Sequence, residues 1–146
     1  MTEISKVTVR VVTGDFDRAG TTGEVYLGLA GMEFKLNSVA SVDYERGSDR
    51  TYVLGTDAGS HLSADAESSD EFAYAARNDP RITTVERAAR HPVYVRLHPV
   101  GEAPDWLARA VSVTVEGQAG PTQEYRWASD PGRWLGCEYG LTVHLD

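Results

Sequence analysis

Residues 6–30 read K-V-T-V-R-V-V-T-G-D-F-D-R-A-G-T-T-G-E-V-Y-L-G-L-A, and this stretch decides the fold. Apolar residues occupy every second position on both sides of a polar loop: Val7, Val9 and Val11 before it, and Val25, Leu27 and Leu29 after it. A period of two is typical of half-buried β-strands, because successive side chains point to opposite faces of a sheet. The loop is too long for a tight hairpin and too polar to be buried. It therefore either crosses between two sheets or binds a ligand.

Six further runs with apolar alternation predict strands in the rest of the chain. They lie at 32–36, 51–54, 93–97, 111–115, 125–127 and 141–145. Turn-forming residues separate them, among them Asp130-Pro131-Gly132, which predicts a turn. Short strands with turn signals between them are typical of antiparallel sandwiches. We therefore predict an all-β fold, an antiparallel β-sandwich of about eight strands in a single domain over residues 1–146, with acid-rich bends gathered at one rim.

Residues 57–91 interrupt this pattern, because alternation disappears and Ala, Ser, Asp, Glu and Arg dominate. A short helix is expected after Ser69, and a second one, of about three turns, is expected after Asp79. Asp79 would be the N-cap of the second helix and Pro80 its first residue. The apolar stripe of this helix consists of Ile82, Val85, Ala88 and Ala89. We predict a helical insertion at about 57–91 that either extends the core or leaves a groove against the sandwich.

The composition narrows the function classes. With 22 acidic and 14 basic residues, the net charge of −8 does not favour nucleic acid, which is bound by clustered Lys and Arg. It also opposes an anionic lipid surface unless a bound cation reverses the local field. The single cysteine, Cys137, excludes an internal disulfide. No apolar run of about 20 residues predicts a membrane span. No signal peptide is visible, so the cytoplasm is the expected location.

Four short motifs follow one another outside the insertion. They are T-G-D…A-G-T at 13–21, Y-E-R-G-S-D at 44–49 with Tyr52 after it, P-D-W at 104–106 with V-S-V at 111–113, and W-L at 134–135. Together they resemble the PLAT (lipoxygenase-homology) family, a β-sandwich found in lipoxygenases, some lipases, polycystins and a bacterial phospholipase toxin. The resemblance implies a binding module that docks enzymes onto membranes, lipid substrates or protein partners, in some members with calcium.

The resemblance also implies a calcium site where the A-G-T loop meets acids on neighbouring loops. Calcium takes six to eight oxygen ligands from carboxylates, backbone carbonyls and water. The candidate ligands in this sequence are Asp17, Gly20, Thr21, Asp43, Asp49 and Asp105. Two departures count against the site: Thr22 stands where the family has Asp, and Arg18 places a cation where a further acid can sit. In the alternative interpretation the aspartates shape turns through Asx hydrogen bonds.

Trp106 and Leu107 are the candidate ligand-binding residues, because they are the only adjacent apolar pair in a predicted loop. Burying such a side chain in lipid stabilises an attachment by about 1.5–3 kcal/mol. In the alternative interpretation Trp106 is a lid on the sandwich core. The leading hypothesis is a stand-alone, non-catalytic binding module for a lipid-like or hydrophobic ligand or a protein partner. Calcium is its candidate cofactor, and peripheral membrane contact is compatible with it.

Two other functions remain open. One is a small enzyme, a cyclase or hydrolase of a hydrophobic metabolite, with its site between the insertion and the sandwich. His98, Asp105 and Glu45 would then act as acid and base. A closed apolar cavity lined by polar groups with shifted pKa values would favour this function. The other is an interaction protein that dimerises through an open sheet edge. A solid core with acidic loop tips would favour the binding module.

Overall fold

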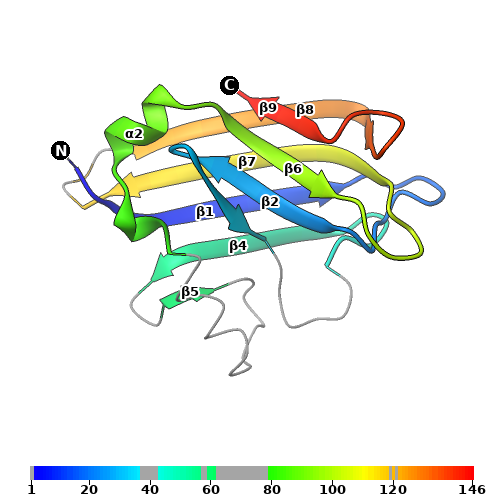
Figure 1. Ribbon diagram of the computed structural model, residues 1–146, viewed down its shortest axis with the longest axis horizontal. Coiled ribbons are helices and arrows are strands. Elements are labelled where there is room, and N and C mark those ends of the chain that lie inside the picture. The colour runs from blue at the N-terminus through cyan, green and yellow to red at the C-terminus, as the bar shows by residue number, and fades with distance from the viewer. Residues whose placement is uncertain (1, 37–42, 57–58, 62–78, 119, 121) are drawn as a thin grey trace.

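The computed structural model describes residues 2–36, 43–56, 59–61, 79–118, 120 and 122–146. Within these residues the chain forms two antiparallel sheets packed face to face (Figure 1). The five-stranded sheet has the order β5–β4–β1–β7–β8, with bounds Gly59–His61, Asp49–Thr56, Ile4–Thr13, Trp106–Gly117 and Thr122–Leu135. The four-stranded sheet has the order β3–β2–β6–β9, with bounds Met32–Lys35, Glu24–Leu29, Val93–His98 and Thr142–Leu145. The predicted all-β antiparallel sandwich is confirmed.

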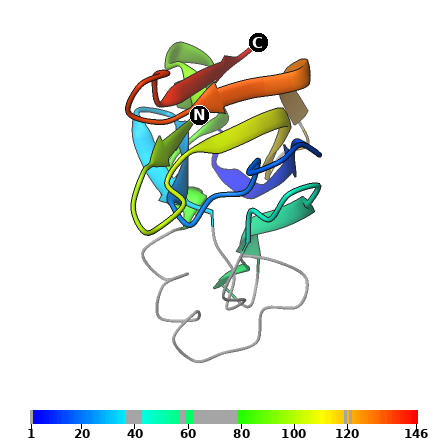
Figure 2. The ribbon, with the colours of Figure 1, turned by 90° about the vertical axis from the view of Figure 1, so that its right-hand side faces the viewer.

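The loop between β1 and β2 crosses from one sheet to the other. β1 lies in the middle of the five-stranded sheet, hydrogen-bonded to β4 on one side and to β7 on the other. β2 pairs with β3 and β6 in the opposite sheet. The two layers and the connections between them are visible when the molecule is viewed from its end (Figure 2).

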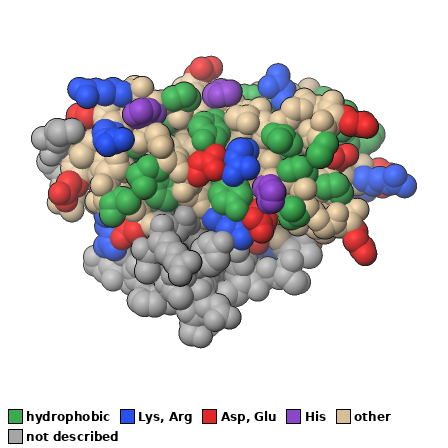
Figure 3. All heavy atoms as spheres, in the orientation of Figure 1, with side chains coloured by type: hydrophobic (Ala, Val, Ile, Leu, Met, Phe, Trp, Pro, Cys, Tyr) green, Lys and Arg blue, Asp and Glu red, His purple; other side chains and the backbone are tan. Residues whose placement is uncertain are grey.

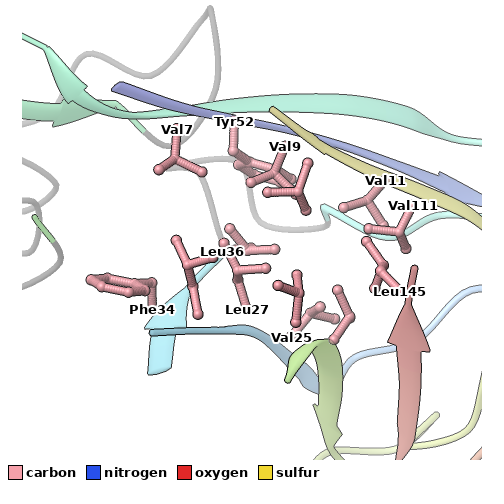
Figure 4. Close-up of a cluster of buried hydrophobic side chains, with 14 of the residues drawn as sticks. Val7, Val9, Val11, Val25, Leu27, Phe34, Leu36, Tyr52, Val111 and Leu145 are labelled. Atoms are coloured by element: carbon pink, nitrogen blue, oxygen red, sulfur yellow. The ribbon is translucent and has the colours of Figure 1, made fainter. Parts of the chain in front are cut away.

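The core lies between the sheets and consists of the alternating residues (Figure 4). Val7, Val9 and Val11 of β1 are fully buried, and they face Val25 and Leu27 of β2 across the interface. Each such side chain stabilises the fold by about 1.5–3 kcal/mol when it leaves water. Further buried side chains from both sheets fill the same layer: Phe34, Leu36, Tyr52, Val111 and Leu145.

Two features of the five-stranded sheet differ from the prediction. The predicted turn at Asp130-Pro131-Gly132 is wrong, because these residues lie inside β8. The irregularity they introduce, with a cis peptide bond at Asp130-Pro131 and a positive φ at Gly132, is matched by a register shift between Ala108 and Ala110 on β7. The strand therefore continues past its turn-forming residues. β5 was not expected at all, since it lies where the sequence predicts helix.

The second predicted helix is divided in two. Asp79 does accept a hydrogen bond from the Arg81 backbone as an N-cap, but the helix it opens is a single 3₁₀ turn, η1, Pro80–Ile82. A separate α-helix, α2, Val85–Arg90, begins after the N-cap Thr84. The prediction of three continuous turns is wrong because Thr83 and Thr84, between the helices, are extended, and this junction hydrogen-bonds to the N-terminal segment. Ile4 N donates to Thr83 O, and Val85 N, at the start of α2, donates to Thr2 O.

The predicted apolar stripe is only partly buried. Val85 and Ala88 pack into the core, whereas Ile82 is 71% exposed. The first predicted helix, after Ser69, lies outside the described residues. None of the helices in the described part of the chain is long and apolar enough to cross a membrane.

One buried hydrogen bond joins two strands of the five-stranded sheet near the end of the core. The indole Nε1 of Trp106 donates to Thr13 Oγ1 over 2.9 Å, and the exposed fractions of these residues are 0% and 1%. The Trp106 ring also packs on Tyr44, with centroids 5.4 Å apart. A buried indole N–H without an acceptor costs about 1–3 kcal/mol.

Replacing Thr13 by Val is therefore expected to lower the free energy of unfolding by about 1–3 kcal/mol, because Val keeps the shape of Thr but cannot accept the indole proton. Urea denaturation measures the change. The control is Thr13→Ser, which keeps the hydroxyl and should retain most of this hydrogen-bond contribution. Equal losses in both variants would show that packing, and not the hydrogen bond, matters at this position.

Candidate functional site

Four loops meet at the end of the sandwich opposite α2, and we call this region the loop end. It consists of residues 14–23, 43–48, 99–105 and 136–141. Antiparallel strands return the chain to the same side after every second strand, which is why connections from both sheets gather there. The loop end lies at the right of Figure 1 and faces the viewer in Figure 2. The acid-rich bends therefore share one rim, as the sequence predicts.

Thr21 and Thr22 bind the first of these loops to two others. The backbone N–H of Thr21 donates to the Tyr44 carbonyl over 3.0 Å, and its hydroxyl donates to the carbonyls of Ala103 and Pro104. Thr22 donates from its backbone to Ala103 O over 2.8 Å and from its hydroxyl to Val100 O over 2.9 Å. The loops at 14–23, 43–48 and 99–105 are thus fixed as one unit.

A second set of contacts closes the other side of the 14–23 loop. Thr13 N donates to Ser48 O and Gly47 N donates to Gly14 O, over 2.9 and 3.0 Å. The Arg46 guanidinium contacts the Asp15 carboxylate over 2.9 Å. This ion pair is exposed, so it contributes at most about 1 kcal/mol and the backbone bonds do most of the fixing.

Gly20 and Gly136 allow the close approach of neighbouring loops. A Cβ at Gly20 would lie 2.8 Å from the Tyr44 carbonyl oxygen, and one at Gly136 would lie 2.2 Å from Asp105 Oδ1. The fourth loop, 136–141, therefore packs directly against the third. A side chain at either position would push two loops apart.

The structure does not bring the predicted calcium ligands together. Among the described residues, no three His, Cys, Asp or Glu side chains approach closely enough to hold one metal ion. Asp49 instead binds Arg10 through both oxygens, over 2.8 and 2.5 Å, and this guanidinium lowers the pKa of Asp49. Asp43 accepts a long hydrogen bond of 3.4 Å from the Tyr52 hydroxyl.

The remaining predicted ligands have other surroundings. Asp17 is exposed, the Asp105 carboxylate lies against Gly136, and the Thr21 hydroxyl is already used between the loops. Calcium requires six to eight converging oxygens. The residues present at the loop end do not fit it.

The predicted ligand-binding pair lies in the core and not in a loop. Trp106 and Leu107 are the first residues of β7, with exposed fractions of 0% and 3%. Trp106 is held by Thr13, and Leu107 packs where a Cβ at Gly14 would lie 2.7 Å from its Cδ2. Neither side chain reaches a lipid surface, because the loops at 14–23 and 99–105 cover the strand ends. The alternative interpretation, a lid on the core, describes Trp106 correctly.

The exposed apolar side chains of the loop end are others, and the sequence analysis missed them. Phe16 is 58% exposed, Val100 36% and Tyr139 55%, and they come from three different loops. The Tyr139 ring is supported by Trp134, with centroids 6.3 Å apart. The sequence feature that could have indicated these residues is a single large apolar residue inside a polar loop, as in D-F-D at 15–17.

The three candidate catalytic residues belong to separate segments. His98 ends β6 opposite Glu24, Asp105 precedes β7, and Glu45 is exposed in the 43–48 loop. A groove of about 320 Å³ does exist in the described part of the chain, but it lies on the outer face of β1, β7 and β8. Its lining includes Arg10, Val12, Ala110, Ser112, Glu124 and Arg126, and none of the three candidates. This groove is not the closed apolar cavity that would favour the small enzyme described above.

Known structures share this fold. The alpha toxin from Clostridium absonum matches 99% of this chain and 32% of its own, with 16% identity and a TM-score of 0.63. Coral 8R-lipoxygenase, described as activated by calcium through a C2-like domain, matches 96% of this chain and 16% of its own, with 18% identity and a TM-score of 0.56. A LOX variant in complex with arachidonate matches the same shares with 19% identity and a TM-score of 0.54.

These likenesses show the fold. The chain spans about a third of the toxin and about a sixth of the lipoxygenases. No protein-family model and no curated protein matches the sequence. The resemblance to lipoxygenase-type sandwiches is thus supported in its architecture, on a fold that does not by itself fix a function.

The role of Asp49 as an ion-pair partner predicts a pH-dependent stability. Because Arg10 lowers its pKa in the folded chain, ionised Asp49 stabilises the fold above the pKa of the unfolded chain, about 3.9. This contribution is lost as the pH falls through the lower folded pKa. Asp49→Asn should therefore cost about 0.2–1 kcal/mol at pH 7 and nothing below both pKa values.

Urea unfolding of the two proteins at neutral and acid pH measures this difference. Asp17→Asn is the control, since Asp17 is exposed and has no ion pair within the described residues, and its stability should match the wild type. A stabilisation by calcium that disappears in Asp49→Asn would restore Asp49 as a metal ligand.

Proposed function

We propose that this chain is a docking module that attaches to a lipid surface through its loop end. The observation that carries this is the exposure of Phe16, Val100 and Tyr139 on three adjoining loops. On the right-hand side of Figure 3, hydrophobic side chains lie next to acidic and basic ones at this end. Large apolar side chains presented together at one end of a molecule are typical of an interaction site.

The frame beneath these side chains is rigid, and this favours binding. The Thr21 and Thr22 bonds and the packing of Gly20 hold the loops before any contact with lipid. Little ordering is then required on attachment, so more of the interaction energy remains as affinity. Full burial of one apolar side chain is worth about 1.5–3 kcal/mol, and these three are already half-buried on average. Together they supply roughly 2–4 kcal/mol, enough for a weak and reversible attachment.

The similar structures are compatible with a lipid-docking role. One was solved with arachidonate, a fatty acid, and another is described as a calcium-activated lipoxygenase with a C2-like domain. Since this chain matches only a small part of those proteins, their chemistry is not part of the proposal. The open groove and the dispersed His98, Asp105 and Glu45 give no observation that favours an enzyme.

The test is binding to uncharged phosphatidylcholine vesicles, measured by flotation. The double variant Phe16→Ala/Tyr139→Ala should bind at least about 10-fold more weakly than the wild type, because two of the three apolar contacts are removed. The matched control is Ile82→Ala. It removes an apolar side chain of 71% exposure at the opposite end, and it should bind like the wild type.

The proposal is wrong if the wild type does not bind the vesicles, or if Ile82→Ala weakens binding as much as the loop variant does. Circular dichroism of each variant separates loss of binding from loss of folding.

A further inference from the structure

The loop end carries a strong negative charge. Its four loops contain seven carboxylates and two arginines, and Arg50, which donates to the Asp43 carbonyl over 3.2 Å, adds a third cation, so the formal charge is seven minus three, or −4. The carboxylates belong to Asp15, Asp17, Asp43, Glu45, Glu102, Asp105 and Glu138, and the cations to Arg18, Arg46 and Arg50. Arg46 is already bound to Asp15. The apolar side chains proposed to touch lipid therefore lie on loops with an excess of negative charge.

The described residues offer no cluster of acidic side chains that a cation could bind to reverse this charge. Asp49 and Asp105 have other contacts, Asp17 is exposed, and within the described residues no three acidic, His or Cys side chains share a site. Asp49, the ligand nearest the strand end, is occupied by a guanidinium from β1. The field that lipid meets at the loop end is thus that of the carboxylates themselves.

We infer that the loop end docks on electrically neutral, zwitterionic lipid without calcium and is repelled by anionic lipid. This inference rests on the proposed docking function and names the class of lipid it selects. Two observations on the same surface support this inference. The exposed apolar side chains are stabilised when they leave water, and the carboxylates are destabilised near a negatively charged surface. A neutral bilayer buries the apolar side chains and does not repel the carboxylates.

The size of the repulsion decides the outcome. An anionic leaflet has a surface potential of about −30 mV, which acts on charges within a Debye length of about 8–10 Å. Four negative charges at that potential weaken binding on the order of 10²-fold. An attachment made by three half-exposed side chains does not withstand such a loss. At about 1 M salt the Debye length falls to about 3 Å, so most of the repulsion should disappear.

The experiment compares two kinds of vesicle, phosphatidylcholine alone and phosphatidylcholine mixed with phosphatidylserine. Binding of the wild-type chain is measured with a chelator, with millimolar calcium and at high salt. We expect the mixed vesicles to bind on the order of 10²-fold more weakly at low salt. High salt should abolish most of this difference, and calcium should leave it unchanged.

A charge variant tests the cause. Asp17→Asn/Glu102→Gln/Glu138→Gln removes three exposed carboxylates that have no ion pair in the described part of the chain. It should narrow the gap between the two vesicle types by roughly 10-fold or more. The control is Glu3→Gln/Glu86→Gln/Glu116→Gln, which changes the net charge equally at the opposite end of the sandwich and should leave the gap as it is. Because Glu116 pairs with Lys6 and Glu86 accepts from Thr2, circular dichroism checks that this variant folds.

The possible failures are distinguishable. Binding to phosphatidylcholine with equal or tighter binding to the mixed vesicles overturns the lipid class and leaves the docking function standing. Calcium-dependent binding to the mixed vesicles overturns the independence from metal. Absence of binding to every vesicle overturns the docking function itself, and this inference with it. An equal effect of the two charge variants shows that net charge, and not the loop end, sets the preference.

Discussion

The packing of β1 against the opposite sheet is the constraint on which the rest of the structure depends. Val7, Val9 and Val11 alternate with polar residues, and all three are completely buried. A shift of β1 by one residue would turn every one of them outward, so the register toward β4 and β7 is strongly specified. β1 ends at Thr13, and its fixed register therefore also fixes where the first loop of the loop end begins.

The position of the loops follows from this arrangement. Because neighbouring strands are antiparallel, the chain leaves the sandwich at the same end after β1, β6 and β8. Loops from both sheets become neighbours there, although they are far apart in sequence. Hydrogen bonds from Thr21 and Thr22 then join three of them. The topology thus creates a surface to which several loops contribute. Apolar and acidic side chains alternate on this surface.

The sequence predicts the sandwich well, because alternation reports directly on burial in a two-layered sheet. It predicts the interruptions poorly. Asp130-Pro131-Gly132 has the composition of a turn, but pairing with β7 carries β8 through it. Asp79 and Thr84 each cap a short helix as helix signals require, whereas hydrogen bonds from the N-terminal strand at Thr83 and Val85 prevent one long helix. These are tertiary effects, and local patterns do not contain them.

The sequence locates the loop end but not the apolar side chains that are exposed there. The motif around residues 13–21 correctly marks the loop end, yet the exposed side chains there are Phe16, Val100 and Tyr139. Trp106 was predicted to bind ligand because it is an apolar residue beside a loop, and its hydrogen bond to Thr13 shows that it belongs to the core. The exposure of a loop side chain depends on how neighbouring loops cover it, and the amino-acid composition of one loop does not contain this information.

Two arginines bind carboxylates near the loop end, although the backbone hydrogen bonds do most of the fixing of the loops. Arg46 contacts Asp15, and Arg10 contacts Asp49, so two carboxylates near the strand ends have a cation within the chain. A guanidinium gives a carboxylate directional hydrogen bonds, but it is covalently fixed and cannot be supplied or withdrawn as a free ion can. Together with the backbone bonds between the loops, these pairs hold the loop end through contacts within the chain. In the proposed docking, the balance between its apolar and its acidic side chains decides which surface it binds.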